Sequence, residues 1–326
     1  MRSMLIHYAK LLGSSLVLLL VVVTILFVLL ELAPGDPMRS LLGDAPASEA
    51  FRARMTAEFG LNDPVWQRYL TYLGNVLTGN LGESIVNRMP VTDLIVGRLA
   101  NTLVLAVLAM AISTPVCFVL GAVAARTRRR WLDGLISGGS VALFSIPNFW
   151  LGLMLITVFS VMLGWLPATG SNAYGEPGIA WQYLILPVVC MAANDFAFRT
   201  RVMRSSTIEA LSQDYIDTAR SKGLSSDQVL WRHALPNAML PMVTIIGLGV
   251  GSLLAGSVLV ERVFGWPGMG LLMVEAINNK DNMVVLGVTI VLTVTILVAN
   301  ILTDITYGLV DPRLRARFSR PAGRAG

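Results

Sequence analysis

Charged and chemically reactive side chains are scarce in this chain. Asp, Glu, Lys and Arg make up only 14% of its 326 residues, and there are two cysteines and two histidines. The sequence has no Gly-x-x-x-x-Gly-Lys-Ser/Thr phosphate-binding loop, which excludes ATP binding of the usual kind. No Ser/His/Asp set and no metal-ligand cluster stands in a plausible polar setting. We therefore expect no catalytic residue, no metal site, no cofactor and no enzymatic activity.

Apolar residues are abundant instead. They make up 55% of the chain, and the mean hydropathy is +0.67, a balance that excludes a soluble domain. Apolar stretches of about 20 residues predict membrane spans. The fold class expected is therefore an all-α integral membrane protein with six transmembrane helices, at 11–33, 99–125, 135–163, 181–199, 239–260 and 284–309.

Two details of these spans bear on processing and on cysteine chemistry. The first span is too long for the core of a signal peptide, and no small-x-small cleavage site follows it, so we expect it to be retained. Cys117 and Cys190 both lie inside predicted spans. They are expected to be packing residues rather than disulfide partners or metal ligands.

The distribution of basic residues predicts the orientation in the membrane. With the N-terminus inside, the cytoplasmic segments hold 17 of the 25 Lys and Arg residues, as the positive-inside rule requires. Both termini are then expected to be cytoplasmic. A net charge of +5 can also indicate nucleic-acid binding, but these charges lie at membrane edges, so no nucleic-acid partner is expected.

The chain is expected to have four parts. Residues 1–33 form a cytoplasmic tip and the first span, and residues 34–98 form a long extracytoplasmic loop. That loop is too long for a simple turn and is expected to fold on the membrane surface. Residues 99–312 form a five-helix core that contains a cytoplasmic loop at 200–238, and residues 313–326 form a basic cytoplasmic tail.

The loop at 200–238 has the pattern of a helix–turn–helix. Ile208, Leu211 and Tyr215 recur at helical spacing, which predicts one apolar face. Gly223 can adopt the left-handed conformation that closes a helix.

Signals for a second helix follow directly. Ser225 and Gln228 have the spacing of a capping box, and Leu224 with Val229 can form the hydrophobic staple around it. Pro236 fits the first turn of the next membrane helix.

The same loop carries a pattern known from one family. It reads Asp-Thr-Ala at 217–219, a Gly six positions after the Asp, and Leu-Pro at 235–236. This resembles the "EAA" loop of permease subunits of bacterial ABC importers, with His233 in place of the usual Ile. The surrounding residues resemble the oligopeptide/dipeptide branch. In that family the loop is a coupling helix docked on the ATPase, and the alternative is an ordinary amphipathic surface helix. The resemblance assigns ATPase coupling to Tyr215, Asp217, Thr218, Ala219, Gly223, Leu224, Leu235 and Pro236.

The third span and two carboxylates are candidates for the translocation pathway or its gate. Residues 145–152 read Ser-Ile-Pro-Asn-Phe-Trp-Leu-Gly, and the family has a similar run. Its proline should kink the helix, and kinked backbone in a span needs support or a water-filled cavity.

Asp195 and Asp304 are ionisable groups within spans, which suggests either the pathway or an inter-helix pair. Arg199 lies one helical turn from Asp195. The gate candidates are Pro147, Asn148, Trp150 and Asp195, with a packing kink and a structural ion pair as the alternatives.

Two further segments resemble this family on the extracytoplasmic side. Residues 60–99 resemble the family's first loop, except that Asn80 replaces the usual Asp; there the loop faces the binding protein, and a structural cap is the alternative. Residues 261–270 resemble the family's Glu-x-Val-Phe-x-Trp-Pro-Gly-x-Gly, and 271–277 then read as a short helix that can dip back into the membrane. The side chains at 261 and 262 are expected to pair with other subunits or to lie at the headgroups. The resemblance assigns the extracytoplasmic turn to Glu261, Trp266, Pro267 and Gly268.

The resemblance covers about 5–317 and implies a function. The chain would be a permease subunit of a type I ABC importer in the bacterial inner membrane, forming half of a pore for di- or oligopeptides. Relatives carry nickel complexes, glutathione, opines or sugars, and the binding protein largely sets the selectivity. The implied partners are a second permease, in a heterodimer, two ATPase subunits that hydrolyse ATP, and an extracytoplasmic binding protein. The alternative is a self-sufficient secondary transporter or channel that uses Asp195 and Asp304.

Overall fold

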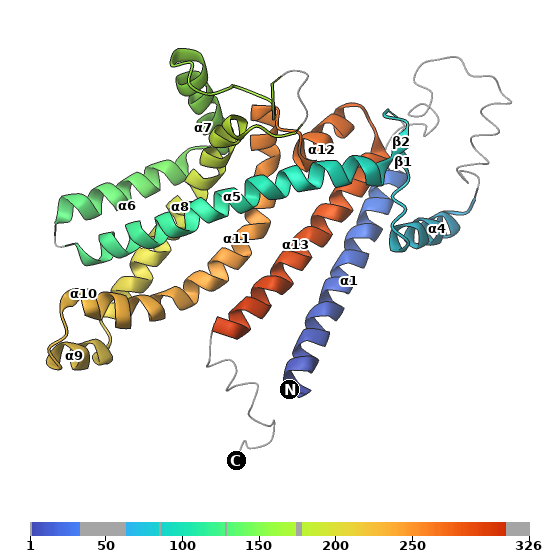
Figure 1. The fold of residues 1–326 in the computed structure, drawn as a ribbon. Coiled ribbons are helices and arrows are strands. Elements are labelled where there is room, and N and C mark those ends of the chain that lie inside the picture. The colour runs from blue at the N-terminus through green and yellow to red at the C-terminus, as the bar shows by residue number, and fades with distance from the viewer. Residues whose placement is uncertain (1, 33–62, 85, 128, 174–177, 311–326) are drawn as a thin grey trace. The chain divides into compact units, whose positions relative to one another are not determined.

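The structure is a computed structural model that describes residues 2–32, 63–84, 86–127, 129–173 and 178–310. Figure 1 shows that long helices dominate this part of the chain. Its residues form two compact units. The first unit comprises Met1–Leu5, Asn101–Pro267 and Ile296–Gly326, and the second comprises Ile6–Ala100 and Gly268–Thr295. This division follows packing, whereas the predicted four parts follow membrane topology and stay a prediction.

The membrane-crossing helices agree with the predicted spans. Among the described residues, five helices are long and apolar enough to cross a bilayer. A sixth span is present if two helical halves that meet at a bend of 101° are counted as one. The first half is α6 (Arg130–Ser145), and the second consists of α7 (Asn148–Leu155) and η1 (Ile156–Met162). The five are α1 (Arg2–Leu32), α5 (Val91–Arg126), α8 (Trp181–Leu211), α11 (Leu235–Phe264) and α13 (Asn282–Val310).

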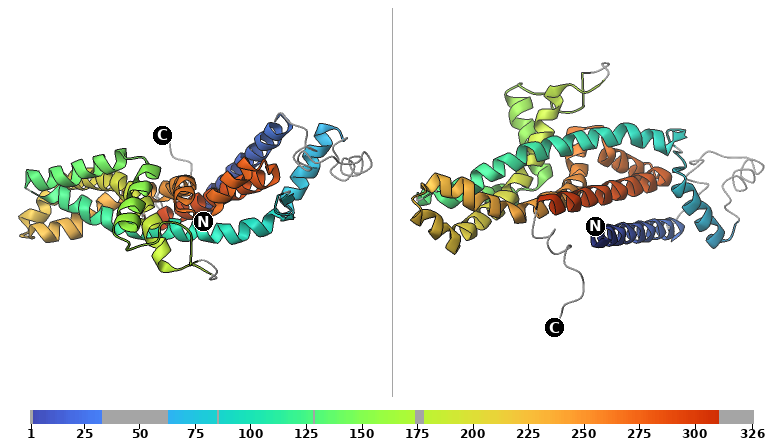
Figure 2. Two further views of the ribbon diagram at one scale, coloured as in Figure 1. Left: turned by 90° about the horizontal axis from the view of Figure 1, so that it is seen from above. Right: turned by 60° about the horizontal axis from the view of Figure 1, so that its bottom comes forward.

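Helix α8 is the packing centre of the first unit. It packs against both α6 and α11, as the views in Figures 1 and 2 show. Many large apolar side chains of these helices point outward, as expected for helices surrounded by lipid rather than water. A central cluster of buried residues joins α5, α8 and α11, and it consists of Leu105, Ala109, Leu186, Val188, Cys190, Met191, Ala192, Leu253, Val260, Phe264 and Trp266.

A second buried cluster of the first unit lies where α5, α8 and α11 meet the short helices between α8 and α11. We call it the loop cluster, because it anchors the segment that the sequence singled out. Cys117 belongs to it, as Cys190 does to the central cluster, so both cysteines are buried packing residues. The loop cluster consists of Cys117, Ala122, Met203, Ala210, Ile216, Ala219, Val229, Leu230, Ala234, Leu235, Ala238 and Met242.

The second unit is smaller and more varied in its elements. It contains α4 (Val65–Leu77), α12 (Met269–Asn278) and the antiparallel hairpin of β1 (Glu83–Ser84) and β2 (Met89–Pro90). Asp281 holds the hairpin in place: its Oδ2 accepts a hydrogen bond of 2.6 Å from the Ser84 hydroxyl. The start of α5 packs on α12 and α13 through Val91, Ile95, Met269, Leu272, Ala276, Val284 and Val288.

Candidate functional site

The loop between α8 and α11 contains a short helix with two distinct faces. Helix α9 (Asp214–Ser221) buries Ile216 and Ala219 in the loop cluster. These residues are three apart, so they lie on one side of the helix. Asp217 and Thr218 are exposed away from that side, and Arg220 is exposed at its edge, where it forms an ion pair of 3.3 Å with Asp217. The helix therefore presents a polar surface on a firmly packed base.

The apolar face predicted for this loop was wrong. Ile208 and Tyr215 are 41% and 39% exposed, and only Leu211 packs against the loop cluster. For Tyr215 the reason is that the chain does not continue as one helix, since α8 ends at Leu211 and α9 starts at Asp214; Ile208 lies within α8 and is exposed there. A spacing counted across this break does not keep residues on one face, and the buried face starts again at Ile216.

Gly223 closes α9 in the predicted left-handed conformation, with φ of 82°. The backbone N–H of Gly223 donates to the carbonyl of Arg220 at 2.9 Å, and that of Leu224 donates to the carbonyl of Ala219 at 3.4 Å. These bonds satisfy carbonyls at the end of the helix. A Cβ at Gly223 would meet no atom within 4 Å, so only the backbone angle requires glycine there.

The predicted capping box is present at the start of α10 (Ser226–Val229). The Gln228 N–H donates to the Ser225 hydroxyl oxygen at 3.3 Å, and the Ser225 N–H donates to Gln228 Oε1 at 3.0 Å. Asp227 also forms an ion pair with Arg126, the last residue of α5. The loop is thus tied both to itself and to the end of a membrane helix.

A π-helix, η2 (Leu230–Ala234), connects α10 to α11. Sequence reasoning missed η2, because no local pattern marks a π-helix. Helix α11 then begins at Leu235, which is buried, and Pro236 lies in its first turn as predicted. The loop thus passes into the next membrane helix without an intervening coil.

The break at Pro147 is held by polar side chains from α8. Asn194 of α8 donates through Nδ2 to the carbonyl of Ile146 at 3.4 Å and also to Oδ1 of Asn148. The thiol of Cys190 donates to the carbonyl of Asn148 at 3.3 Å. The predicted kink is therefore a full break, and its freed backbone groups are satisfied by protein, as a break in a membrane requires. Trp150, one turn further, is half exposed.

Asp195 takes part in a buried polar cluster. Its Oδ1 lies 2.9 Å from Nη2 of Arg199, which is fully buried. Its Oδ2 accepts a hydrogen bond from Ser113, and Arg199 Nη1 donates to Thr114 Oγ1 at 3.1 Å. The expected pair between the two α8 residues is present, and the two α5 residues are additions that the sequence did not indicate. The cluster links α8 to α5 through charge-assisted hydrogen bonds.

Glu261 lies in the interior of the first unit, which corrects the expectation of headgroups or another subunit. It is fully buried, and its Oε1 accepts a hydrogen bond of 2.8 Å from Thr102 of α5. Trp266 is also fully buried, and its Nε1 donates to the carbonyl of Asn101 at 3.2 Å. The Asn101 amide in turn donates to the carbonyl of Pro267 at 2.8 Å. The turn is thus attached to its own bundle.

Gly268 precedes α12 in the second unit and is buried. The expected short helix at 271–277 lies within α12. The long loop before residue 63, the tail from residue 311 and the side chain of Asp304 lie outside the described residues, so the expectations that fall on them stay predictions. No group of three or more His, Cys, Asp or Glu side chains within the described ranges could hold a metal ion.

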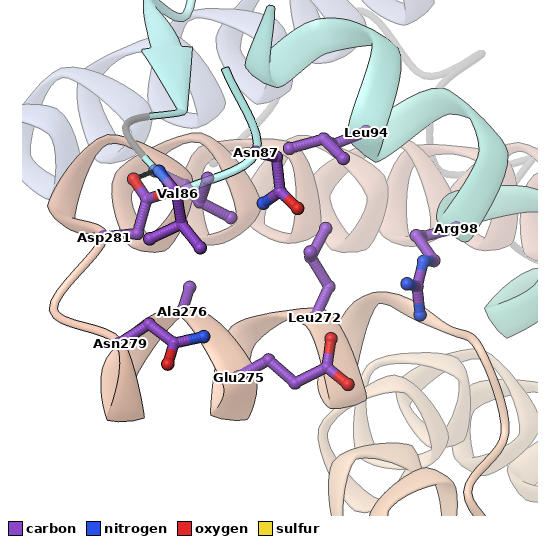
Figure 3. Close-up of a pocket in the computed structure, with 10 residues that line it drawn as sticks. Val86, Asn87, Leu94, Arg98, Leu272, Glu275, Ala276, Asn279 and Asp281 are labelled. Atoms are coloured by element: carbon purple, nitrogen blue, oxygen red, sulfur yellow. Dashed lines mark hydrogen bonds between the residues drawn. The ribbon is translucent and has the colours of Figure 1, made fainter. Parts of the chain in front are cut away.

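A cavity of about 270 Å³ lies within the second unit, between β1–β2, α5 and α12. Figure 3 shows Arg98 and Glu275 at one end of it and Asn279 and Asp281 at the other. Arg98 and Glu275 are half-buried, and neither forms an ion pair with a described residue. Sequence reasoning did not find this site, because its residues are separated by more than 170 positions. The remaining wall consists of Val86, Asn87, Leu94, Leu272, Ala276 and Val284.

Comparison with known proteins identifies the fold. A chain of the MetNI methionine ABC transporter, in an inward-facing conformation, superimposes with a TM-score of 0.57 at 18% sequence identity, over 67% of this chain and 96% of that chain. The likeness shows a shared fold, that of the permease of type I ABC importers.

Two relatives align over nearly the whole chain. The oligopeptide transport system permease protein AppB of Bacillus subtilis (strain 168) is 40% identical over 304 residues, 92% of this chain and 96% of that protein. The dipeptide transport system permease protein DppB of Escherichia coli (strain K12) is 39% identical over 313 residues, 89% of this chain and 92% of that protein.

Two family models match the chain. The one described as "Binding-protein-dependent transport system inner membrane component" matches residues 117–316. The one described as "Binding-prot-dependent transport system membrane comp, N-term" matches residues 4–106. Together they span both units and all of the loop between α8 and α11. The chain therefore belongs to the family of inner-membrane components of binding-protein-dependent transport systems.

Proposed function

We propose that this chain is the permease subunit of an ATP-driven importer of di- or oligopeptides, and that α9 is the element that docks on the ATPase. One observation carries the second part of the proposal: α9 exposes Asp217, Thr218 and Arg220 from a base that is buried through Ile216 and Ala219. An ordinary amphipathic surface helix is anchored in the same way, so the proposal rests equally on the EAA-like pattern at 217–236, which lies within the matched family model. The names of the relatives, an oligopeptide and a dipeptide permease, support peptides as the substrate class.

The docked loop can act as a rigid lever. Closure of the ATPase pair would push α9, and the capping box at Ser225 and the ion pair between Asp227 and Arg126 would pass the displacement to α5. Leu235 and Pro236 would pass it to α11. Transport then requires that the nucleotide state favour one permease conformation over the other, since equal docking energies would shift nothing.

We assign the gate to the region where α8 meets the broken span. Pro147 and Asn148 form the break, and Trp150 follows it. Asp195 comes directly after Asn194, the residue whose side chain holds the break. Because buried ion pairs and satisfied breaks have discrete arrangements, the region can switch between two packings instead of deforming gradually. In this proposal Asp195 positions α8 against α5 and does not carry protons.

The orientation proposed places both termini in the cytoplasm. The extracytoplasmic end then includes the turn of Glu261, Trp266, Pro267 and Gly268, and also α12. We propose that this end receives the binding protein, with Arg98 and Glu275 offering one positive and one negative group to charged residues of that protein. A second, related permease would complete the pore, as a heterodimer, and two ATPase subunits would bind below.

The alternative of a self-sufficient secondary transporter is not favoured. It needs intramembrane carboxylates that are free to exchange ions, whereas Asp195 is engaged by Arg199 and Ser113. Membership of a family that depends on binding proteins also argues against it.

The proposal is tested by purifying the tagged chain in mild detergent and identifying the co-purifying proteins by mass spectrometry. A Walker-motif ATPase and a second permease are expected. Asp217→Cys should then form a cross-link to the ATPase, whereas Thr157→Cys, on the π-helix η1, should not. A chain that purifies alone, and that moves solute along a gradient after reconstitution, would overturn the proposal.

A further inference from the structure

Helix α4 carries an apolar surface that the described residues cover only in part. On one side Tyr69 and Tyr72 contact Phe27 of α1, with ring centroids 5.3 and 5.8 Å apart. Next to this covered strip the apolar surface continues without a partner in the described chain. Its residues are among the most exposed large apolar side chains of the unit: Trp66 at 65%, Leu70 at 56% and Leu77 at 73%.

The spacing of these residues makes them one face. Positions 66, 70 and 77 are four and seven apart, so at 3.6 residues per turn they lie within a narrow strip of the helix surface. Gln67, Thr71 and Asn75, by contrast, lie on the other side. Helix α4 is thus amphipathic, with an apolar surface wider than its contact with α1 requires.

The depth of α4 is fixed by two contacts with α1. The Tyr69 hydroxyl and the Thr24 hydroxyl are hydrogen bonded at 2.7 Å, and Arg68 forms an ion pair of 3.0 Å with Glu31. The apolar window of α1 covers Leu12–Leu29. Thr24 therefore lies inside the window near its end and Glu31 lies just beyond it, about 10 Å further along the helix. The two contacts thus place α4 beside the end of the apolar window, where we expect the hydrocarbon core to give way to the headgroups.

The composition of α4 suits that level. Arg68 is its one charged residue, and it is paired within the unit. The Tyr72 hydroxyl is buried without a described partner, and burial raises the pKa of Tyr72 to about 12. Aromatic side chains with one polar atom are typical of the membrane interface.

We propose that α4 is an interfacial anchor whose Trp66, Leu70 and Leu77 insert into the lipid at the boundary between headgroups and acyl chains. Lipid is the partner for two reasons. The exposed face carries no charge to complement a protein surface, and the helix that α4 contacts, α1, itself exposes Ile25, Val28 and Leu29 within its apolar window. This inference goes beyond the proposed transport function and does not depend on the substrate.

The anchor would have a structural consequence for the second unit. Helix α4 ends at Leu77, and the hairpin β1–β2 begins at Glu83. Lipid contact would therefore hold the start of the hairpin at a fixed height above the membrane, and with it the cavity of Figure 3.

The test measures the depth of single positions on α4. Both native cysteines of the full chain would be replaced by alanine. Nitroxide labels would then be attached to single cysteines at 66, 70 and 77. Single cysteines at 67, 71 and 75 would serve as matched controls. The protein would be reconstituted in nanodiscs with its co-purifying subunits. At each position, the rate at which the label collides with oxygen, which concentrates in lipid, is compared with the rate at which it collides with a water-soluble nickel chelate. We expect the oxygen-to-nickel ratio to be several-fold higher at 66, 70 and 77 than at the control positions.

Two results would overturn the inference. Equal ratios on both faces would mean that α4 stands in water, and protection from both reagents at 66, 70 and 77 would mean that a protein covers the face.

A second measurement avoids cysteine replacement: quenching of tryptophan fluorescence by brominated lipids should fall in Trp66→Phe relative to the unmodified chain. Unchanged quenching would also contradict lipid contact. Loss of the ATPase from the preparation would count against the proposed function and leave this measurement intact.

Discussion

The guanidinium group of Arg199 occupies the space that a side chain at Gly249 would fill. A Cβ built on Gly249 of α11 would overlap Nη2 of Arg199 and lie 3.3 Å from its Cζ. The guanidinium cannot simply move aside, because Asp195 and Thr114 hold its other faces. Helix α11 therefore completes a cluster that already joins α8 to α5.

Gly249→Ala should destabilise the protein, because the methyl group must displace a buried, paired cation. Overpacking of a well-packed interior costs about 1–3 kcal/mol, so we expect a lower thermal unfolding midpoint in detergent. Gly251→Ala is the matched control on the same helix, since its Cβ would meet only Cγ2 of Ile296 at 3.4 Å. Equal midpoints for the two variants would show that the Arg199 site is loosely packed.

Removing one partner of the buried ion pair should lower the free energy of unfolding more than removing both partners. Asp195→Ala leaves the Arg199 charge buried and unpaired, which costs about 3–5 kcal/mol, whereas an apolar replacement of both charges is often near neutral. We expect the double variant Asp195→Ala/Arg199→Met to unfold at a higher temperature than Asp195→Ala alone. The reverse order would mean that water already reaches the pair.

Gly223→Val should uncouple transport from ATP hydrolysis while leaving the chain inserted. A β-branched residue in the left-handed conformation costs about 1–3 kcal/mol, and the turn can escape this strain only by moving α9. Gly134→Val is a control with equally open surroundings but without a positive φ. Reconstituted importer is assayed for substrate uptake per ATP hydrolysed. Normal uptake by Gly223→Val at equal membrane abundance would count strongly against the lever.

Ser225→Ala should loosen α10 without affecting the bundle. It removes the side-chain acceptor of the capping box, a loss of about 1 kcal/mol. Amide hydrogen exchange at residues 226–229 should speed up several-fold, and exchange in α11 should stay unchanged. Ser226→Ala, one residue further on, lies outside the capping box and serves as control. Equal exchange in both variants would show that the loop cluster alone holds α10.

The elements that sequence predicted well are those set by neighbours along the chain. Span positions follow from the length of apolar runs, and the capping box and the turn at Gly223 follow from residues within four positions of one another. The pair of Asp195 with Arg199 was accessible for the same reason, being one helical turn apart.

The features that sequence could not provide depend on distant partners. Glu261 is buried next to Thr102, 159 residues away, whose hydroxyl group donates a hydrogen bond to it. The size of the bend at Pro147 depends on Asn194 of another helix, so proline alone located the break but not its angle of 101°. The buried face of α9 was misassigned because a two-residue interruption after Leu211 resets the helical register.

The broken span also has a consequence for the order of events during synthesis. The groups that satisfy the break at 146–148 belong to Cys190 and Asn194, which leave the ribosome later. At roughly 5–20 residues per second, the nascent chain waits several seconds with open carbonyls at this point. Neither half is long enough to span the bilayer alone. Helix α6 has 16 residues, about 24 Å against a hydrocarbon core of about 30 Å, and α7 with η1 is no longer than α6. We therefore expect the two halves and α8 to leave the insertion machinery together.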